Sequence, residues 1–371
     1  MSIFGDRGHD THPRRGLFGL TPESDTFLHL DLMRFIASMR IVLVHFAPRL
    51  GLTHAQVDGM NAFVDVFFVI SGIVISHVYH ARIAQPGAFR TFLVARVARL
   101  VPLHVLATLA FVGIGLLSAM VGLAVNDADK YDLSCLPPSL LLTHAIIGCD
   151  KPVFNFVSWS ISAEFAMYLL FPLLMAAGLW RRWLLVVLAA GFVALFSWAD
   201  PGWWLRTYDH GVLRAVPAFL LGMGLHLYRA ELGRIALPGW LFVPAVAGLV
   251  AAMTLVGAGL AVLGLSYGCV VLLFILDRRP ETHSPLLRYL APLGQLTYSI
   301  YMLHPLFHAI ALALVAQRIA HLEGMALHLA TLASLPVLIG VSYLSLVLFE
   351  TPARRWIRAR WGAPRDKGAA G

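Results

Sequence analysis

The sequence has few charged residues for its length. Only 13% of its 371 residues are charged, whereas soluble domains carry about 25%. So small a share is too low to cover a water-facing surface, which excludes a soluble globular protein. Instead, 59% of the residues are hydrophobic, the mean hydropathy is +0.76, and apolar runs of about 20 residues recur along the chain. The predicted fold class is all-α, a polytopic transmembrane helical bundle.

Neither end of the chain reads as a membrane span. Residues 1–27 lack an apolar core beside a small-residue cleavage site, so we expect no cleavable signal peptide and interpret them as a cytoplasmic N-terminal tail. Residues 28–349 form the predicted transmembrane domain, and residues 350–371 form a basic cytoplasmic C-terminal tail. The net charge of +8 does not indicate a nucleic-acid partner, because the basic residues follow the membrane topology. We expect a multi-pass protein of the cell membrane, here the bacterial inner membrane.

Ten apolar runs separated by charged breaks predict the membrane spans. They lie near residues 28–48, 62–80, 100–124, 154–179, 183–199, 210–228, 238–256, 259–276, 293–315 and 326–349. With both termini cytoplasmic, 20 of the 28 Lys and Arg residues fall in inner segments and six in outer ones, as the positive-inside rule requires. A single crossing at 238–276 would move the basic C-terminal tail outside, so we expect two tight spans there, broken at Gly257 to Gly259.

The three cysteines occupy two different settings. Cys135 and Cys149 lie in the longest predicted outer loop, near residues 125–153. In an oxidising compartment they could form a disulfide, and two unpaired thiols are an equally open alternative. Cys269 lies inside a predicted span and is expected to serve packing.

The first predicted span carries three ionisable groups, Arg34, Arg40 and His45. Arg34 and His45 are eleven residues apart, which returns them to nearly the same helix face about 16 Å apart along the axis. Asp31 precedes Arg34 by three residues, so the two can pair and partly neutralise the guanidinium. Charged groups inside spans usually face the bundle interior or a water-filled cavity. A structural Arg–Asp pair with an interfacial histidine stays open as the alternative.

Two carboxylates are predicted at the same depth as His45. Asp65 lies at the outer end of the second span and Glu164 at the outer end of the fourth. A carboxylate bonded to one imidazole nitrogen makes the other nitrogen a better base, which is the chemistry of an activated hydroxyl. At the opposite face, Arg96 and Arg99 with nearby Arg90 suit a ligand bearing several phosphates. An isolated arginine pair there would more simply reflect the positive-inside rule.

Ordered motifs of the chain resemble the membrane-bound acyltransferase-3 family, of the exopolysaccharide and O-antigen acetylase type. "LDLMRFIASMRIVLVHF" resembles its opening, with an Arg-x10-His motif. "DVFFVISGIVIS", "RVARLVPLH" and "WSISAEFAMYLLFP" are similar to the segments that follow. "RAVPAFLLGM", "LTYSIYMLHPLF" and "FETPARRW" match its later landmarks. These motifs appear in family order from residue 30 to 356, so the resemblance makes residues 28–349 the acyltransferase domain.

The resemblance implies roles for individual residues. His45 would be the catalytic histidine with Arg34 as its partner, and Glu164 and Asp65 would support the site. Arg96, Arg99 and Arg90 would hold the phosphates of an acyl-CoA donor, most simply acetyl-CoA. Substrate-contacting or supporting residues would be Asp31, Arg40, Ser71, Trp159, Ser160, Ser162, Arg214, Tyr301 and His304, the last two as a packed, hydrogen-bonded pair.

The chain departs from the family pattern at two positions. Arg40 occupies a position that is commonly apolar, where it would shape substrate choice or pair with another helix. Phe165 stands where family members usually have a second acidic residue, which leaves Glu164 as the single carboxylate of that segment.

The expected function is that of an integral-membrane O-acyltransferase. An acyl group, by default acetyl, would move from cytoplasmic acyl-CoA to a hydroxyl of a carbohydrate or glycolipid acceptor at the extracytoplasmic side. Direct transfer and an acyl-histidine intermediate both stay open, and no metal is expected. The alternatives are tailoring of a small molecule or antibiotic, a transporter with a charged intramembrane pathway, and a binding or sensory membrane protein. The sequence does not settle the oligomeric state, so a dimer stays open.

Overall fold

The computed structural model describes residues 16–21, 26–83, 85–120, 122 and 128–362, and within them the chain is helical without a β-strand. The long helices are α1 (Leu28–Phe46), α3 (Phe63–Tyr79), α4 (Ala88–Met120), α6 (Trp159–Ala176), α7 (Arg182–Ala199), α8 (Val212–Leu227), α10 (Phe242–Leu255), α11 (Leu260–Asp277), α13 (Thr297–Phe307), α14 (Gly324–Leu344) and α15 (Thr351–Trp361). The short ones are α2 (His54–Val57), α5 (Leu136–Leu140), α9 (Arg229–Leu232) and α12 (Pro285–Leu290).

Each of the ten predicted spans coincides with a helix, and seven helices are long and apolar enough to cross a membrane. These seven are Asp58–Tyr79, Ala88–Met120, Phe156–Ala176, Arg182–Ala199, Leu260–Asp277, Pro285–Ile319 and Gly324–Trp361. Of the other three, α8 and Gly239–Leu255 are shorter, and α1 carries three charged residues in 19. An all-helical membrane bundle is confirmed, whereas the count of ten spans and the cytoplasmic termini stay predictions.

The predicted break between the seventh and eighth runs is present as a turn between two helices. Helix α10 ends at Leu255, and α11 begins at Leu260. Gly257 has φ +79°, a left-handed conformation that a residue without a side chain adopts at little cost. The chain therefore reverses here in a few residues, and the 39-residue uncharged stretch forms a helical hairpin.

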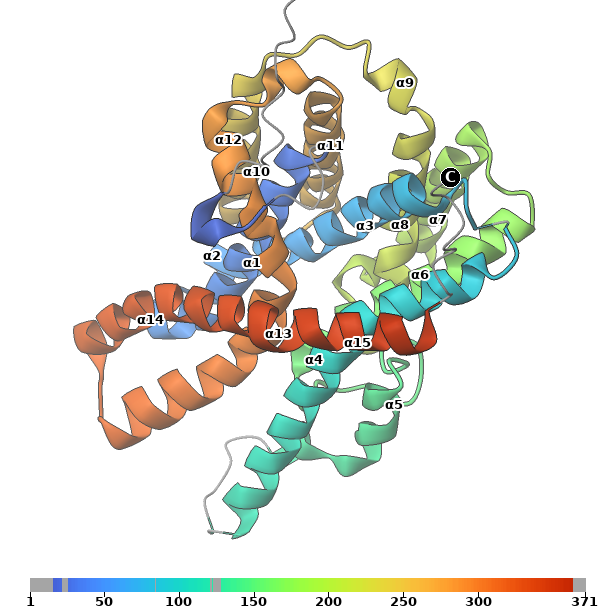
Figure 1. The fold of residues 1–371 in the computed structure, drawn as a ribbon. Helices are drawn as coiled ribbons and strands as arrows, with labels where there is room; N and C mark the ends of the chain where they lie inside the picture. The colour runs from blue at the N-terminus through green and yellow to red at the C-terminus, as the bar shows by residue number, and fades with distance from the viewer. Residues whose placement is uncertain (1–15, 22–25, 84, 121, 123–127, 363–371) are drawn as a thin grey trace, which may run out of the picture.

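The helices gather around α3, which packs closely along α8 (Figure 1). A Cβ atom at Gly72 would lie 2.3 Å from the carbonyl oxygen of Phe219, and one at Gly222 would lie 2.1 Å from that of Val69. Only glycine permits this approach, as is common where membrane helices pack through small residues. The contact matters for the site because α3 carries Asp65 and α8 carries Arg214.

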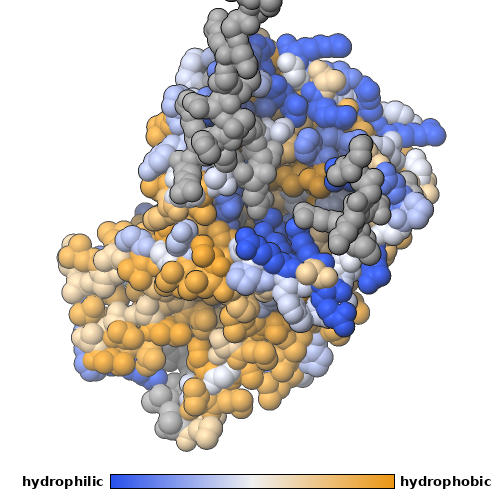
Figure 2. All heavy atoms as spheres, in the orientation of Figure 1, coloured by the Kyte–Doolittle hydropathy of each residue, from blue (hydrophilic) through white to orange (hydrophobic). Residues whose placement is uncertain are grey.

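The last two long helices form one continuous rod, whose surface is strongly apolar along α14 (Figure 2). Helices α14 and α15 run across the front of α13 and α4 in Figure 1, joined by the π-helical turn Ser345–Glu350. Figure 2 shows apolar residues gathered over α14 and the adjoining part of α4, with hydrophilic residues toward the α9 and α15 ends. Exposed side chains of α14 include Leu329, Leu332 and Val337. Such a surface fits hydrocarbon and is poorly suited to water.

Cys135 and Cys149 form a disulfide, which settles the alternative that the sequence left open. Their Cα atoms are 5.4 Å apart, and the bond closes the loop that precedes α6. Cys269 is a free, buried cysteine of α11, in keeping with its expected packing role.

Removing this disulfide is expected to destabilise the protein. Replacing Cys135 and Cys149 together with serine frees a loop of about 15 residues, which corresponds to about 3 kcal/mol of lost chain constraint. We expect the double variant to have a lower thermal unfolding midpoint in detergent. In the wild-type protein, the thiols of Cys135 and Cys149 should react with maleimide only after reduction. Cys269→Ser is the matched control, since it leaves the disulfide intact. Labelling of Cys135 or Cys149 by maleimide in the folded, unreduced protein would contradict the pairing.

Candidate active site

Two cavities follow one another along α3 inside the bundle. The arginine cavity, about 790 Å³ including the space at its mouth, is lined by Arg34, Ser71, Arg96, Arg99, Glu164 and Tyr168 among others. The histidine cavity, about 860 Å³ including its mouth, is lined by His45, Asp58, Asn61, Trp204, Tyr208 and Arg214 among others. The two cavities share only two lining residues, Val64 of α3 and Tyr301 of α13. A cationic compartment and an imidazole compartment thus meet at one valine and one tyrosine.

The two cavities open among different segments of the chain. The histidine cavity is bordered by residues from four segments that lie between predicted spans, represented by Asp58, Pro152, Trp204 and Ala258. The arginine cavity instead reaches the later part of α3, at Ile75, and the first part of α4. From their shared boundary, the two cavities therefore extend in opposite directions along α3.

His45 is held by a second histidine. Its Nδ1 lies 2.8 Å from Nε2 of His304, and the two rings stack with centroids 4.9 Å apart. Nδ1 of His304 lies 3.2 Å from the carbonyl oxygen of Ile300, which can only accept, so this nitrogen carries the hydrogen. In the neutral pair, Nε2 of His304 then accepts from Nδ1 of His45, which leaves Nε2 of His45 with an unprotonated lone pair. The fold thus selects the tautomer that a general base needs.

The carboxylate expected beside His45 is not there among the described residues. Asp65 is 1% exposed and pairs with Arg214, which is 3% exposed: Nη2 of Arg214 lies 2.5 Å from Oδ2, and Nε lies 3.4 Å from Oδ1. The guanidinium also donates to the carbonyl oxygen of Asn61 and lies 5.0 Å over the Trp159 ring. Asp65 therefore forms an ion pair with the buried Arg214. The predicted hydrogen bond between this carboxylate and the imidazole of His45 is not formed.

Glu164 faces the arginine cavity and lies away from His45. Its Oε1 accepts from Ser71 Oγ at 2.7 Å and from Tyr168 Oη at 2.5 Å. Tyr168 is one helical turn after Glu164, so i, i+4 spacing was the signal in the sequence that could have identified it. The second expected carboxylate therefore belongs to the other compartment.

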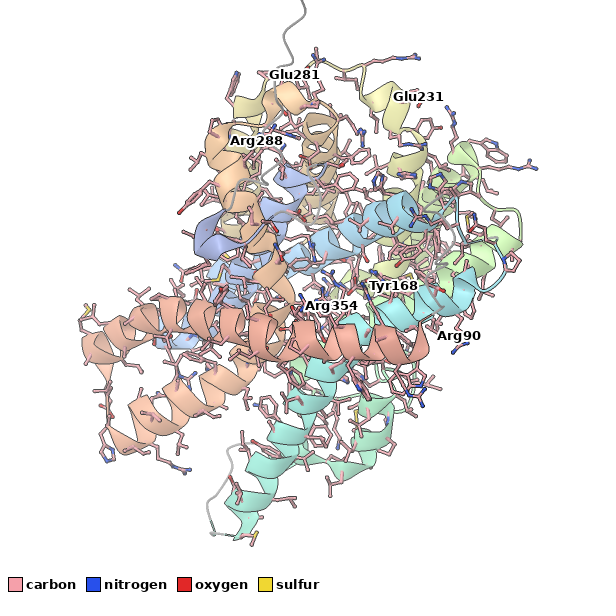
Figure 3. The ribbon with its side chains drawn as sticks, viewed as in Figure 1. Arg90, Tyr168, Glu231, Glu281, Arg288 and Arg354 are labelled. Carbon is pink, nitrogen blue, oxygen red and sulfur yellow. A yellow bond between two sulfur atoms is a disulfide. The ribbon has the colours of Figure 1, made fainter. Side chains whose placement is uncertain are left out.

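The arginine cavity brings together Arg34, Arg96 and Arg99, but Arg90, which was predicted to bind phosphate with them, does not line it. Arg34 pairs with Asp31 at 3.4 Å, as the spacing predicted. Arg96 donates to Tyr79 Oη at 3.3 Å and lies over the Tyr168 ring at 5.6 Å. Arg90, at the beginning of α4, is exposed and points away from the bundle (Figure 3).

Of the remaining predicted residues, Tyr301 lies at the boundary between the two cavities, and Ser160 holds it there. Ser160 Oγ donates to Tyr301 Oη at 2.8 Å, and that hydroxyl donates to the carbonyl oxygen of Val157 at 3.2 Å. Tyr301 and His304 are in ring contact at 5.9 Å, but their side chains hydrogen-bond to different partners, so the expected bond between them is not formed. The Tyr301 ring is thereby fixed between the two cavities.

Two other predicted residues lie outside both cavities. Ser162 Oγ donates to the carbonyl oxygen of Leu142 at 2.7 Å and accepts from the backbone of Ala145, so it fastens the disulfide-closed loop to α6. Arg40 is half-buried and lines neither cavity.

Three aromatic residues of the histidine cavity, Phe156, Trp204 and Tyr208, were not singled out by the sequence, unlike Trp159 and Tyr301. Phe156 packs edge-on against His45 at 4.9 Å, and Trp204 and Tyr208 line the wall. The Tyr208 hydroxyl donates to the carbonyl oxygen of Phe156, and burial raises the pKa of Tyr208 well above its usual range, so it stays a neutral donor. Trp204 and Tyr208 come from the segment between α7 and α8, whereas Phe156 lies at the start of the helix that continues as α6, so the three share no regular spacing that could be recognised in the sequence.

The fold and the two cavities define a multi-pass membrane protein with a polar interior site. A family model described as an acyltransferase domain matches residues 27–348. The chain therefore belongs to the acyltransferase-3 family of membrane acyltransferases, which confirms the resemblance seen in its motifs. Acyltransferase MdmB from Streptomyces mycarofaciens is 32% identical over 156 residues, which are 38% of this chain and 37% of that protein. The match thus spans just over a third of that relative's length. No solved structure matches the chain.

Proposed function

We propose that the protein transfers an acyl group, by default acetyl, from cytoplasmic acyl-CoA to a hydroxyl of a sugar-containing acceptor at the extracytoplasmic side. The observation that carries this proposal is the pair of cavities that meet at Val64 and Tyr301. One compartment is rich in guanidinium groups, and the other holds an imidazole with a free lone pair. A donor and an acceptor approaching from opposite faces would meet at this boundary.

The arginine cavity is the proposed donor site. Arg96 and Arg99 lie one helical turn apart on α4, where their guanidinium groups can form paired hydrogen bonds to phosphate oxygens. The acyl-bearing arm of the donor would extend past Ser71 toward Tyr301, and Arg34 would stabilise negative charge along this path. Glu164, bonded to Ser71 and Tyr168, holds these side chains in place.

The histidine cavity is the proposed acceptor site. Trp204, Tyr208 and Trp159 supply aromatic faces, while Asp58 and Asn61 supply hydrogen-bonding groups. Aromatic surface with a few placed polar groups is typical of small-molecule sites, and sugar rings offer both apolar faces and hydroxyls. A glycan or lipid-linked sugar would enter between the loops that border this cavity.

The proposed reaction joins the two compartments at His45. Nε2 of His45 takes the proton from the acceptor hydroxyl, and the oxygen attacks the thioester carbonyl carbon. The carbon–sulfur bond breaks, the new carbon–oxygen bond remains, and the CoA thiolate takes up the proton from His45. His304 positions the ring by accepting from Nδ1, and it stabilises the cationic ring while that proton is held. An acyl-histidine intermediate would use the same lone pair.

Two observations support placing the acceptor outside. Basic residues concentrate in the segments at the arginine-cavity side, as the positive-inside rule expects of the cytoplasm. The Cys135–Cys149 disulfide closes a loop whose end, at Pro152, borders the histidine cavity, and disulfides persist in oxidising compartments.

The donor site is tested by replacing Arg96 and Arg99 together with alanine. Each charge-assisted bond to phosphate contributes about 1.5–3 kcal/mol, so the apparent KM for acetyl-CoA should rise roughly 100-fold with kcat much less affected. Transfer of labelled acetyl groups to a sugar acceptor, or release of CoA by purified protein in nanodiscs, gives the readout. Arg90→Ala is the matched control, because this arginine is exposed outside the cavity, and its KM should change little. An unchanged donor KM in the double variant would leave these arginines a topological role only.

A further inference from the structure

Three buried side chains from distant parts of the sequence meet at one end of the bundle. His29 lies in the first turn of α1, and Asp277 ends α11. His283 follows the short turn Pro280–Thr282, whose Glu281 is labelled in Figure 3. They are 2%, 3% and 8% exposed, respectively. One side-chain nitrogen or oxygen atom from each lies within 4.8 Å of the other two. None of the three lines either cavity, so the cluster is separate from the proposed active site.

The cluster contains a nitrogen that the protein leaves unpaired. Nδ1 of His29 lies 2.8 Å from Oδ1 of Asp277, whereas Nε2 of His283 lies 3.4 Å from the same oxygen and has no hydrogen-bond partner in the described part of the chain. A buried polar atom without a partner costs about 1–3 kcal/mol. Capping of the first turn of α1 by Asp277 explains why His29 lies beside this carboxylate. It does not explain why the imidazole of His283 is buried there without a hydrogen-bond partner for its Nε2.

We propose that His29, Asp277 and His283 bind a divalent transition-metal ion, with zinc the best match. Two imidazole nitrogens and one carboxylate oxygen are common zinc ligands, and the donor set is too rich in nitrogen for magnesium or calcium. Ligand atoms of a tetrahedral zinc site lie about 3.4 Å apart, since zinc–nitrogen bonds are about 2.0–2.1 Å. The distance of 3.4 Å from Nε2 of His283 to Asp277 matches this value, and the distance of 2.8 Å from Nδ1 of His29 is about 0.6 Å shorter, so the carboxylate and the His29 ring would move slightly apart to admit the ion. Water supplies the fourth ligand.

The surroundings orient the carboxylate for this role. The backbone N–H of His29 donates to Oδ1 of Asp277 at 2.8 Å, and that of Leu30 donates to Oδ2 at 3.0 Å. Such outer hydrogen bonds hold a ligand carboxylate in one orientation. The carboxylate also stands between the ion and the positive end of α1, while the negative end of α11 faces the ion favourably.

The ion would fasten three segments at the end of the helix that carries Arg34 and His45. His29 binds through Nδ1 and His283 through Nε2, so α1, α11 and the turn after α11 are joined at one point. The consequence is structural: metal removal should loosen the start of α1 and lower the stability of the whole bundle.

Metal analysis of the full chain tests the site. The protein is purified in detergent through a tag without histidine from zinc-supplemented cells, and zinc is measured by mass spectrometry. We expect about one zinc per chain, and loss of most of it in His29→Ala and His283→Ala. His210→Ala is the matched control, because His210 is an exposed histidine outside the cluster, and it should retain zinc. Wild-type protein without zinc, or equal zinc in wild type and His283→Ala, would overturn the proposal.

A second measurement uses only the wild-type protein, so it tests the site even if His29→Ala and His283→Ala fail to fold. Wild-type protein treated with 1,10-phenanthroline should lose several degrees of thermal midpoint and regain them with added Zn²⁺. Cobalt(II) added to the chelated protein should give the intense visible absorption of a four-coordinate nitrogen–oxygen site. An unchanged midpoint together with no cobalt absorption would show that the three residues form only a hydrogen-bonded cluster.

Discussion

Replacing His45 with alanine is expected to remove acyl transfer while the protein still folds and inserts. Nε2 of His45, in the histidine cavity, is the proposed proton acceptor, and loss of a general base typically lowers rates about 100- to 10,000-fold. Turnover of labelled acetyl-CoA by protein in nanodiscs measures the effect, and gel filtration with thermal melting reports folding.

A histidine at the surface provides the control for this result. His321→Ala removes an exposed imidazole that lines neither cavity and should retain wild-type turnover. If His45→Ala also transferred acetyl groups at the wild-type rate, the imidazole would have no part in the chemistry, although the donor site could still stand on its own test.

Asp65→Ala is expected to produce the largest loss of stability of any single substitution considered. The change leaves the Arg214 guanidinium buried without its carboxylate, and breaking a buried ion pair in this way costs about 3–5 kcal/mol. The unfolding midpoint in detergent should fall sharply, and expression in the membrane should drop with it.

Two further variants separate the ion pair from simple loss of a side chain. Asp209→Ala breaks an exposed pair with Arg206 and should shift the midpoint far less. Asp65→Leu combined with Arg214→Met removes both charges and should be more stable than Asp65→Ala alone. Equal destabilisation by the double change and by Asp65→Ala would mean that the pairing itself contributes little.

The helices and the local pairs could be predicted from the sequence, because both depend on neighbours in the chain. Apolar length located the spans, and three-residue spacing placed Asp31 beside Arg34. The partners of His45 and Asp65 could not be predicted in this way. His304 is 259 residues from His45, and Arg214 is 149 residues from Asp65, so only helix packing decides these contacts.

Position along the predicted spans was a poor guide to which residues touch, and of the three residues placed at one depth only Asp65 is fully buried. His45, Asp65 and Glu164 were placed at one level from their positions in the spans. Helix rotation then turned Glu164 toward Ser71 and left Asp65 to a cation on α8. The cluster of His29, Asp277 and His283, the proposed metal site, was missed for the same reason, since His29 and Asp277 are 248 residues apart.

The boundary between the two cavities at Val64 and Tyr301 has a consequence for the membrane potential. A continuous watery channel at this place would let protons flow down their gradient and would discharge the membrane potential, which is worth about 2.3 kcal/mol per charge at 100 mV. It would also let bulk water hydrolyse the acyl-CoA thioester without forming the acylated acceptor. In the proposed function, Val64 and Tyr301 would restrict ion flow between the donor and acceptor sites, and the hydrogen bond from Ser160 holds the Tyr301 side chain in place for this role.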